Sequence, residues 1–139
     1  MTQDLFCSCN NDHSAQGAAQ AVEDGAALGA LFENLENMDQ LPHLMRVFEK
    51  VRKPRTTRIT NESDSMRSIF NLPDGDLQRK RDRQLTTMQP FVGYPNRWAD
   101  PDFQPWLLGY DVEADVLDQW QIHQRRSYET RTCCHDSFV

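Results

Sequence analysis

Cysteine and histidine side chains near the two ends of this chain are the first candidates for chemistry. Each end carries two cysteines followed by one histidine: Cys7, Cys9 and His13, and Cys133, Cys134 and His135. Thiolates and imidazoles are good zinc ligands, but structural zinc sites separate two cysteines by roughly two to four residues. Neither pair has that spacing, and one site would need ligands from opposite ends of the chain. We therefore expect free thiols and no metal ligands.

A second candidate is a run of small residues that opens a predicted helix. From residue 14 the sequence reads Ser-Ala-Gln-Gly-Ala-Ala. The first N–H groups of a helix have no partner within the helix, and the helix dipole adds partial positive charge there. At Gln16, Gly17, Ala18 and Ala19 no bulky side chain blocks an approaching anion. The pattern is compatible with an anion site, although tight helix packing is the commoner reason for such residues.

The elements that must position these residues are predicted to be helices. Apolar periodicity favours helices over residues 15–37, 42–70, 76–88, 101–109 and 112–124. Aspartates stand where N-caps are needed, at Asp39, Asp100 and Asp111. Pro54 should bend the second helix, because it removes a hydrogen-bond donor. No strand pattern or internal repeat is evident, so the expected fold class is mainly α, with four to five helices.

The first predicted helix has two adjoining apolar faces. One consists of Ala18, Val22, Ala26 and Gly29, and the other of Ala21, Leu28, Leu31, Leu35 and Met38. Acidic side chains such as Glu23 and Asp24 take the remaining positions. The small residues in the first half of this helix would let another backbone or a ligand approach closely.

Composition and charge exclude several classes of protein. The chain has 139 residues and a formal net charge of −6, which disfavours a nucleic-acid partner. No apolar run approaches the roughly 20 residues needed to cross a bilayer, so no membrane contact is expected. Neither glycine-rich nucleotide-binding motif occurs, which excludes a complete nucleotide-binding domain. The start lacks the pattern of a secretory signal, and a cytoplasmic location is expected.

Further motifs narrow the function. Residues 48–59 (FEKVRKPRTTRI) have the form [YF]-E-x-x-R-x-P-R-x-x-R-[IV], and LPDG at 72–75, NRWADP at 96–101 and WLLGYD at 106–111 follow. Together with A-Q-G-A-A, residues 14–123 resemble the C-terminal part of FAD-dependent aromatic-ring monooxygenases. The similarity is to the salicylate hydroxylase and para-hydroxybenzoate hydroxylase type, in particular its fungal members. The resemblance implies the C-terminal helical part of an α/β FAD-binding fold.

The resemblance also implies a cofactor and a chemistry. In the complete enzymes NAD(P)H reduces FAD, oxygen adds to the flavin, and an aromatic ring is hydroxylated. The helix start that matches Gln16, Gly17, Ala18 and Ala19 faces the pyrimidine edge of the flavin in this family. Backbone N–H groups and the helix dipole stabilise the negative charge of the reduced flavin there.

The charged residues that match the family pattern are interpreted as structural. Glu23 and Asp24 correspond to an E-D pair that we expect to bond neighbouring segments. Arg52, Arg55 and Arg58 match the arginine motif, and we interpret them as a solvated helix face with local ion pairs. None of these residues is predicted to be catalytic.

Two family features are missing from this sequence. The G-D-x-x-H-x-x-x-P segment that contacts FAD is replaced by Cys-Ser-Cys-Asn-Asn-Asp-His at 7–13, where Asp12 and His13 have the wrong spacing. The βαβ unit that holds the ADP moiety and the substrate-covering sheet are also missing. The chain therefore resembles a truncated enzyme that binds FAD weakly or not at all and is inactive alone.

The expected organisation has three parts. Residues 1–13 form a disordered or misassigned tail, residues 14–124 the helical part of the monooxygenase domain, and residues 125–139 a disordered tail. The alternative function is a non-enzymatic helical interaction module. Its exposed apolar faces would then pair with a partner protein or with a second copy.

Overall fold

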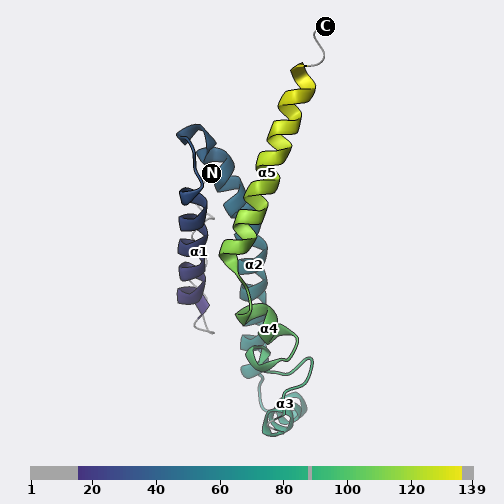
Figure 1. Ribbon diagram of the computed structural model, residues 1–139. Coiled ribbons are helices and arrows are strands. Elements are labelled where there is room, and N and C mark those ends of the chain that lie inside the picture. Colours follow the sequence, from purple (N-terminus) through teal and green to yellow (C-terminus); the bar gives the residue numbers. More distant parts are fainter. Residues whose placement is uncertain (1–15, 88, 136–139) are drawn as a thin grey trace. The chain divides into compact units, whose positions relative to one another are not determined.

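The computed structural model describes residues 16–87 and 89–135, with side chains described as far as residue 127 (Figure 1). Its helices are α1 (Gln16–Glu33), α2 (Leu41–Phe70), α3 (Asp76–Thr86), α4 (Phe103–Leu108) and α5 (Val112–His135). Two short 3-10 helices lie at Met38–Gln40 and Arg97–Ala99. No strand occurs in these described ranges. The predicted class, mainly α with four to five helices, is confirmed.

The chain divides into two compact units. One is built mainly from residues 56–110, and the other from residues 18–55 together with the chain from residue 111 onward. Helix α2 contributes its second half to the former unit and its first half to the latter. We call them the loop unit (residues 56–110) and the clamp unit (residues 18–55 and 111 onward).

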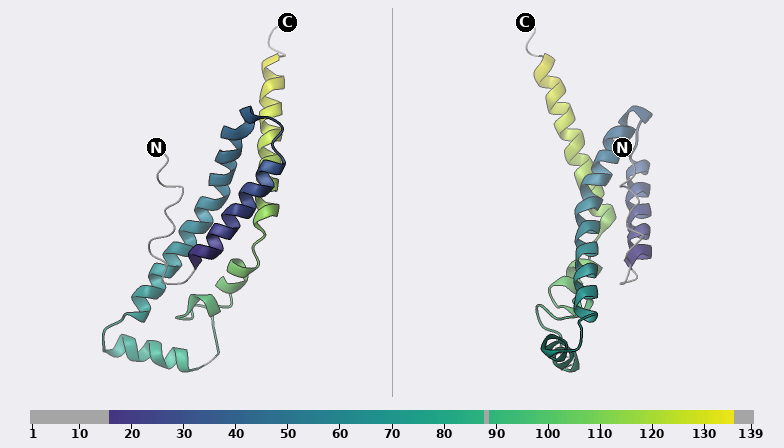
Figure 2. Two further views of the ribbon diagram at one scale, coloured as in Figure 1. Left: turned by 90° about the vertical axis from the view of Figure 1, so that its left-hand side faces the viewer. Right: turned by 180° about the vertical axis from the view of Figure 1, so that it is seen from behind.

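Three helices build the core of the clamp unit. Helix α1 lies alongside the first half of α2 in both views of Figure 2. The buried apolar residues of α2 have the spacing of a single helix face: Leu44, Val47, Phe48 and Val51. Helix α5 buries Val112, Val116 and Trp120, the face predicted from its sequence.

Helix α1 buries only a small part of the two apolar faces identified in its sequence. Its buried residues are Gln20, Ala27 and Leu31, whereas Ala18 and Gly29 are exposed, and 73% of Val22 is accessible to solvent. Most of the first apolar face is therefore open to solvent, and on the second face only Leu31 is buried. Polar side chains of α1, described below, turn toward α2 and determine which face is buried.

Helix boundaries differ from the prediction in four places. Asp39 does not cap α2, because it lies inside the 3-10 helix Met38–Gln40. Helix α1 ends at Glu33 instead of near residue 37, and the Asn34 side chain donates to the carbonyl of Ala30 at 2.9 Å. Helix α3 ends at Thr86 instead of residue 88. Helix α5 runs to His135, well past residue 124.

Pro54 does not interrupt α2, which is helical from Leu41 to Phe70. The predicted bend at this proline stays a prediction. None of the described helices combines the length and the apolar character needed to cross a membrane. The cytoplasmic location likewise stays a prediction.

An apolar cluster forms the core of the loop unit. Ile59, Phe103 and Leu107 are buried together, and Trp98 and Trp106 pack against them. The Phe103 ring centroid lies 5.2 Å from that of each tryptophan. Such stacked and tilted aromatic pairs stabilise beyond the area that they bury.

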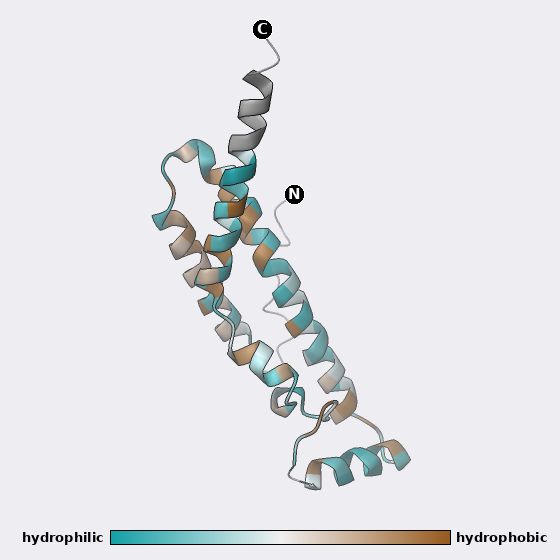
Figure 3. Ribbon diagram, turned by 45° about the vertical axis from the view of Figure 1, so that its right-hand side comes forward, coloured by the Kyte–Doolittle hydropathy of each residue, from teal (hydrophilic) through white to brown (hydrophobic). Residues whose placement is uncertain are grey.

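Helix α3 is held to the end of α2 by polar contacts. It has no buried residue and is hydrophilic along most of its length (Figure 3). Arg81 Nη1 donates to the carbonyl oxygens of Ile69 and Phe70, both at 2.9 Å. These bonds satisfy carbonyls of the last turn of α2, which have no partner within the helix.

Candidate functional site

The predicted site residues form the first turn of α1. Gln16 opens the helix, and Gly17, Ala18 and Ala19 follow it. The first two residues are half-buried and the two alanines are exposed. The turn itself contains no acidic residue that would compete for the positive end of the helix dipole. Its chemistry therefore suits the negatively charged edge of a ligand.

A network of five charged and polar side chains fixes α1 against α2 directly after that turn. Arg52 Nε donates to Asp24 Oδ1 at 2.7 Å, Nη1 to Glu23 Oε2 at 2.6 Å and Nη2 to Gln20 Oε1 at 2.8 Å. Arg55 binds both carboxylate oxygens of Glu23, through Nε at 2.7 Å and Nη2 at 2.8 Å. Bidentate arginine–carboxylate pairs of this kind fix geometry as well as charge. We call these residues the arginine clamp.

Because the charges of the arginine clamp are buried, each of them needs a partner of opposite charge. The Arg52 and Arg55 side chains are only 3% and 5% exposed, against 22% for Glu23. Burial acts to raise the pKa of Glu23, but hydrogen bonds and charges from Arg55 and Arg52 outweigh it and hold the pKa below its ordinary value. Burial acts to lower the pKa of Arg52, and Asp24 and Glu23 outweigh it in turn. Two cations and two anions balance, so no buried charge is left without compensation.

The solvated-face interpretation of the arginine motif is wrong for two of its three members. Arg52 and Arg55 are buried and pair with residues 28 to 32 positions away in the sequence. Arg58 is exposed, and its guanidinium carbon lies 4.0 Å from the centroid of the Trp106 ring. The structural role predicted for Glu23 and Asp24 is confirmed, since both bond a neighbouring helix.

One signal in the sequence could have identified the clamp. Gln20, Glu23 and Asp24 are spaced as one face of a helix, and Arg52 and Arg55 are three apart on another. Two acidic side chains facing two basic ones give a neutral set that can be buried. Sequence alone does not say that the two faces meet.

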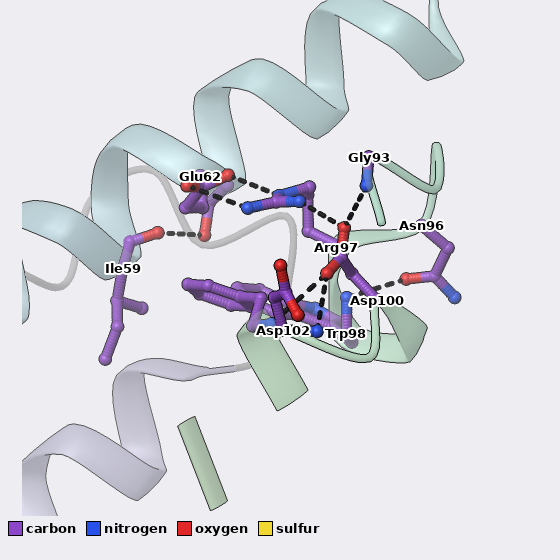
Figure 4. Close-up of polar contacts among 10 residues, drawn as sticks. Ile59, Glu62, Gly93, Asn96, Arg97, Trp98, Asp100 and Asp102 are labelled. Atoms are coloured by element: carbon purple, nitrogen blue, oxygen red, sulfur yellow. Dashed lines mark hydrogen bonds and ion pairs between the residues drawn. The ribbon is translucent and has the colours of Figure 1, made fainter. Parts of the chain in front are cut away.

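The loop unit is organised by a different charged residue, Asp100, which is fully buried. Its Oδ1 accepts from the backbone N–H groups of Asp102 at 2.9 Å and Phe103 at 3.2 Å. Its Oδ2 accepts from the backbone N–H of Gly93 at 2.7 Å and from Arg97 Nη1 (Figure 4). The carboxylate thus bonds the first N–H groups at the start of α4 and closes the preceding loop, as predicted for a capping side chain. The helix begins later than predicted, at Phe103, and the residue at its N-cap position is Asp102.

Arg97 links this aspartate to α2. Its Nε donates to Glu62 Oε2 at 2.8 Å. Burial acts to raise the pKa of Asp100, but the backbone N–H groups around it and the charge of Arg97 hold the pKa below its ordinary value. Both carboxylate oxygens are engaged within the fold, so Asp100 is a structural residue.

The structure does not test the predictions made for the four cysteines. Cys7 and Cys9 lie outside the described residues, as do the side chains of Cys133 and Cys134. Within the part of the chain that the structure describes, no group of three or more histidine, cysteine or acidic side chains is placed to hold a metal ion.

Comparison with known proteins gives the class to which these helices belong. No protein-family model matches the chain. Related sequences are nevertheless FAD-dependent monooxygenases, as the motifs predicted. The chain is a homologue of these enzymes and corresponds to about a quarter of their length.

Three relatives illustrate the match. The chain is 41% identical over 101 residues to the FAD-dependent monooxygenase OpS4 of Beauveria bassiana, which covers 72% of this chain and 24% of that protein. It is 42% identical over 117 residues to FAD-dependent monooxygenase phomE of Diaporthe leptostromiformis, covering 84% and 29%. It is 34% identical over 98 residues to 3-amino-4-hydroxybenzoate 2-monooxygenase PtnB3 of Streptomyces platensis, covering 70% and 22%.

Proposed function

We propose that this chain is the helical segment of an FAD-dependent monooxygenase that supports the flavin from one side and does not carry out the reaction alone. This proposal rests on the match to OpS4 and phomE, which covers 72% and 84% of this chain but only 24% and 29% of those two enzymes. Bound FAD would supply the redox chemistry, taking electrons from NAD(P)H and activating oxygen for hydroxylation of an aromatic substrate.

The residues proposed to hold the flavin are Gln16, Gly17, Ala18 and Ala19. Their backbone N–H groups at the start of α1 would stabilise negative charge on the pyrimidine edge of the ring. Two features of the first turn support this role: it lacks acidic residues, and its alanines are exposed. This chain supplies no proposed catalytic residue.

Arg52, Arg55, Glu23 and Asp24 are proposed as positioning residues. The arginine clamp begins at Gln20, directly after the proposed flavin-facing turn, and holds α1 against α2 through charge-assisted bonds of 2.6 to 2.8 Å. A helix end can stabilise developing charge only if its orientation is fixed in advance. The clamp would provide that orientation.

A chimaera tests this proposal directly. Residues 16–123 of this chain would replace the matching segment of OpS4, and we expect the purified chimaera to retain FAD. Ala18→Asp in the chimaera should lower its FAD content, because a carboxylate at the helix start repels the flavin although it favours the helix itself. Ala21→Asp, at another exposed position of α1, is the matched control. Equal FAD content in the two variants would contradict the proposed site.

We further propose that the isolated chain self-associates through exposed apolar side chains. Val22, Met38, Leu77 and Leu108 are each at least 68% exposed, and exposed apolar surface favours association. Sedimentation of the purified chain over a range of concentrations tests this, with a concentration-independent monomer as the contrary result. The interaction-module alternative rests on this surface alone, and no relative favours it.

A further inference from the structure

Two histidines from different helices of the clamp unit meet at its surface. His43 lies near the start of α2 and His123 in α5, and a hydrogen bond of 3.1 Å joins His43 Nδ1 and His123 Nε2. His43 is exposed and His123 is half-buried, so the nitrogens lie near solvent. The His123 ring stacks on Trp120 at 5.8 Å between centroids and 12° between planes. Trp120 itself is only 3% exposed.

We infer that His43 and His123 form a two-nitrogen binding site for a divalent transition-metal ion. Imidazole nitrogens bind such ions at about 2.0–2.1 Å, which places two neighbouring ligands about 2.9 Å apart at a right angle and about 3.3 Å apart in a tetrahedron. The observed 3.1 Å lies between these values, and an ion bound by both nitrogens would replace the shared hydrogen. Water molecules would complete the coordination. This site includes none of the four cysteines and does not depend on the proposed flavin function.

The surroundings set which ion binds and how strongly. Each histidine stands on a helix, and the stack on Trp120 fixes the orientation of one ring, so little ordering is needed on binding. Arg46 and Lys50 lie close enough to act electrostatically on His123, and they weaken attraction for any cation. The Lys50 ammonium is bonded to Gln119 Oε1 at 2.8 Å. Among divalent first-row ions, Cu²⁺ binds nitrogen ligands most tightly and is the ion of choice for a test.

The experiment uses the full chain with serine at all four cysteines, because thiols would bind or reduce the added ion. Cu²⁺ is titrated at neutral pH, and electron paramagnetic resonance reports the number of coordinated nitrogens. We expect two imidazole nitrogens and a rise in the unfolding temperature on binding, since the ion stabilises the folded state. His43→Ala and His123→Ala should each weaken binding by about tenfold or more, because either leaves a single donor in place of a chelate.

Controls come from the two remaining histidines. His13→Ala and His135→Ala should leave both the affinity and the spectrum unchanged. His43 is the decisive variant, because its side chain is exposed and its loss should leave the fold intact, as circular dichroism would verify. Unchanged Cu²⁺ affinity in folded His43→Ala would overturn the inference, as would weakening of equal size in His135→Ala.

Discussion

The two units of this protein use buried charge in opposite ways. In the clamp unit, Arg52 and Arg55 are buried against acidic residues of another helix, 28 to 32 positions away in the sequence. In the loop unit, Asp100 is buried mainly against backbone N–H groups, with Arg97 as a charged partner, and all of them lie no more than seven positions away. The first arrangement joins helices, and the second shapes one loop over an apolar cluster of Ile59, Phe103 and Leu107.

This difference predicts how each unit fails. Removing one partner from a buried ion network leaves the other charges without compensation, which costs more than the pair contributes. Removing a carboxylate that accepts backbone N–H bonds leaves neutral donors without partners, which costs less per group. Removing a carboxylate from the clamp unit should therefore lower the free energy of unfolding more than removing one from the loop unit.

The largest effect is expected for Glu23→Gln. Glu23 is bonded by both Arg52 and Arg55, so the neutral amide leaves an excess of buried positive charge. We expect the free energy of unfolding to fall by about 3 kcal/mol, the lower end for a broken buried pair because Glu23 is partly exposed. Urea denaturation followed by circular dichroism measures the change. Glu33→Gln, at an exposed position of the same helix, should change it by about 0.5 kcal/mol or less; equal effects of the two would refute the clamp.

Asp100→Ala is expected to have the next largest effect on the free energy of unfolding. The substitution leaves the N–H groups of Gly93, Asp102 and Phe103 without their acceptor. It also removes one of the two carboxylates bonded to Arg97, which keeps its bond to Glu62. We expect a loss of about 2 kcal/mol. Asp102→Ala is the matched control, because this neighbouring side chain is exposed and makes no capping hydrogen bond. Thermal unfolding of both variants gives the answer. A loss larger than that of Glu23→Gln would reverse the proposed ranking of the two units.

Acid should remove the stabilisation that the carboxylates of Glu23 and Asp100 supply. The folded state lowers the pKa of Glu23 from 4.5 and that of Asp100 from 3.8. A lowered pKa means that the stabilisation is fully present above these ordinary values and is lost as the pH falls below them toward the folded-state pKa. The contribution of these two carboxylates to the free energy of unfolding should therefore be nearly constant from neutral pH to about pH 5 and then decline. In Glu23→Gln the decline should be shallower, and parallel curves for parent and variant would contradict this assignment.

The smallest effects concern glycines. Gly25 and Gly29 lie inside α1, and nothing lies within 4 Å of a Cβ added at either position. Alanine at each should raise the free energy of unfolding by about 0.5–1 kcal/mol through helix propensity. Gly93→Ala should lower it, because Gly93 has φ +86° in the loop that Asp100 closes. Chemical denaturation of the three variants tests the signs, and a destabilising Gly25→Ala would show that this face of α1 is packed.

Local features of the fold could be predicted from the sequence. Asp100 and Asp111 were identifiable as caps because an N-cap bonds N–H groups two or three positions ahead, as in the 3.0 Å bond from Ala114 N to Asp111 Oδ1. The order and number of helices followed from apolar periodicity for the same reason.

Non-local features could not be predicted in this way. The spacing of Arg52 and Arg55 fits a solvated face as well as a buried one, and only the position of α1 decides between them. The apolar residue Val22 is exposed while Gln20 is buried, because the clamp, not apolar content, determines the buried face. What the first turn of α1 faces in a complete enzyme depends on segments outside this chain.

The central claim is that this chain supplies only one part of a flavin site. A helix N-terminus contributes roughly 0.3–1 kcal/mol to binding a charge at an exposed position, whereas ordering a ligand against a protein costs at least about 4 kcal/mol. Fluorescence titration of FAD with the purified chain, with NAD(P)H oxidation followed in parallel, tests the claim most directly. We predict a dissociation constant of about 1 mM or weaker and no oxidation. Quenching of FAD at micromolar concentrations of the chain would contradict the claim and require a flavin site elsewhere in these residues.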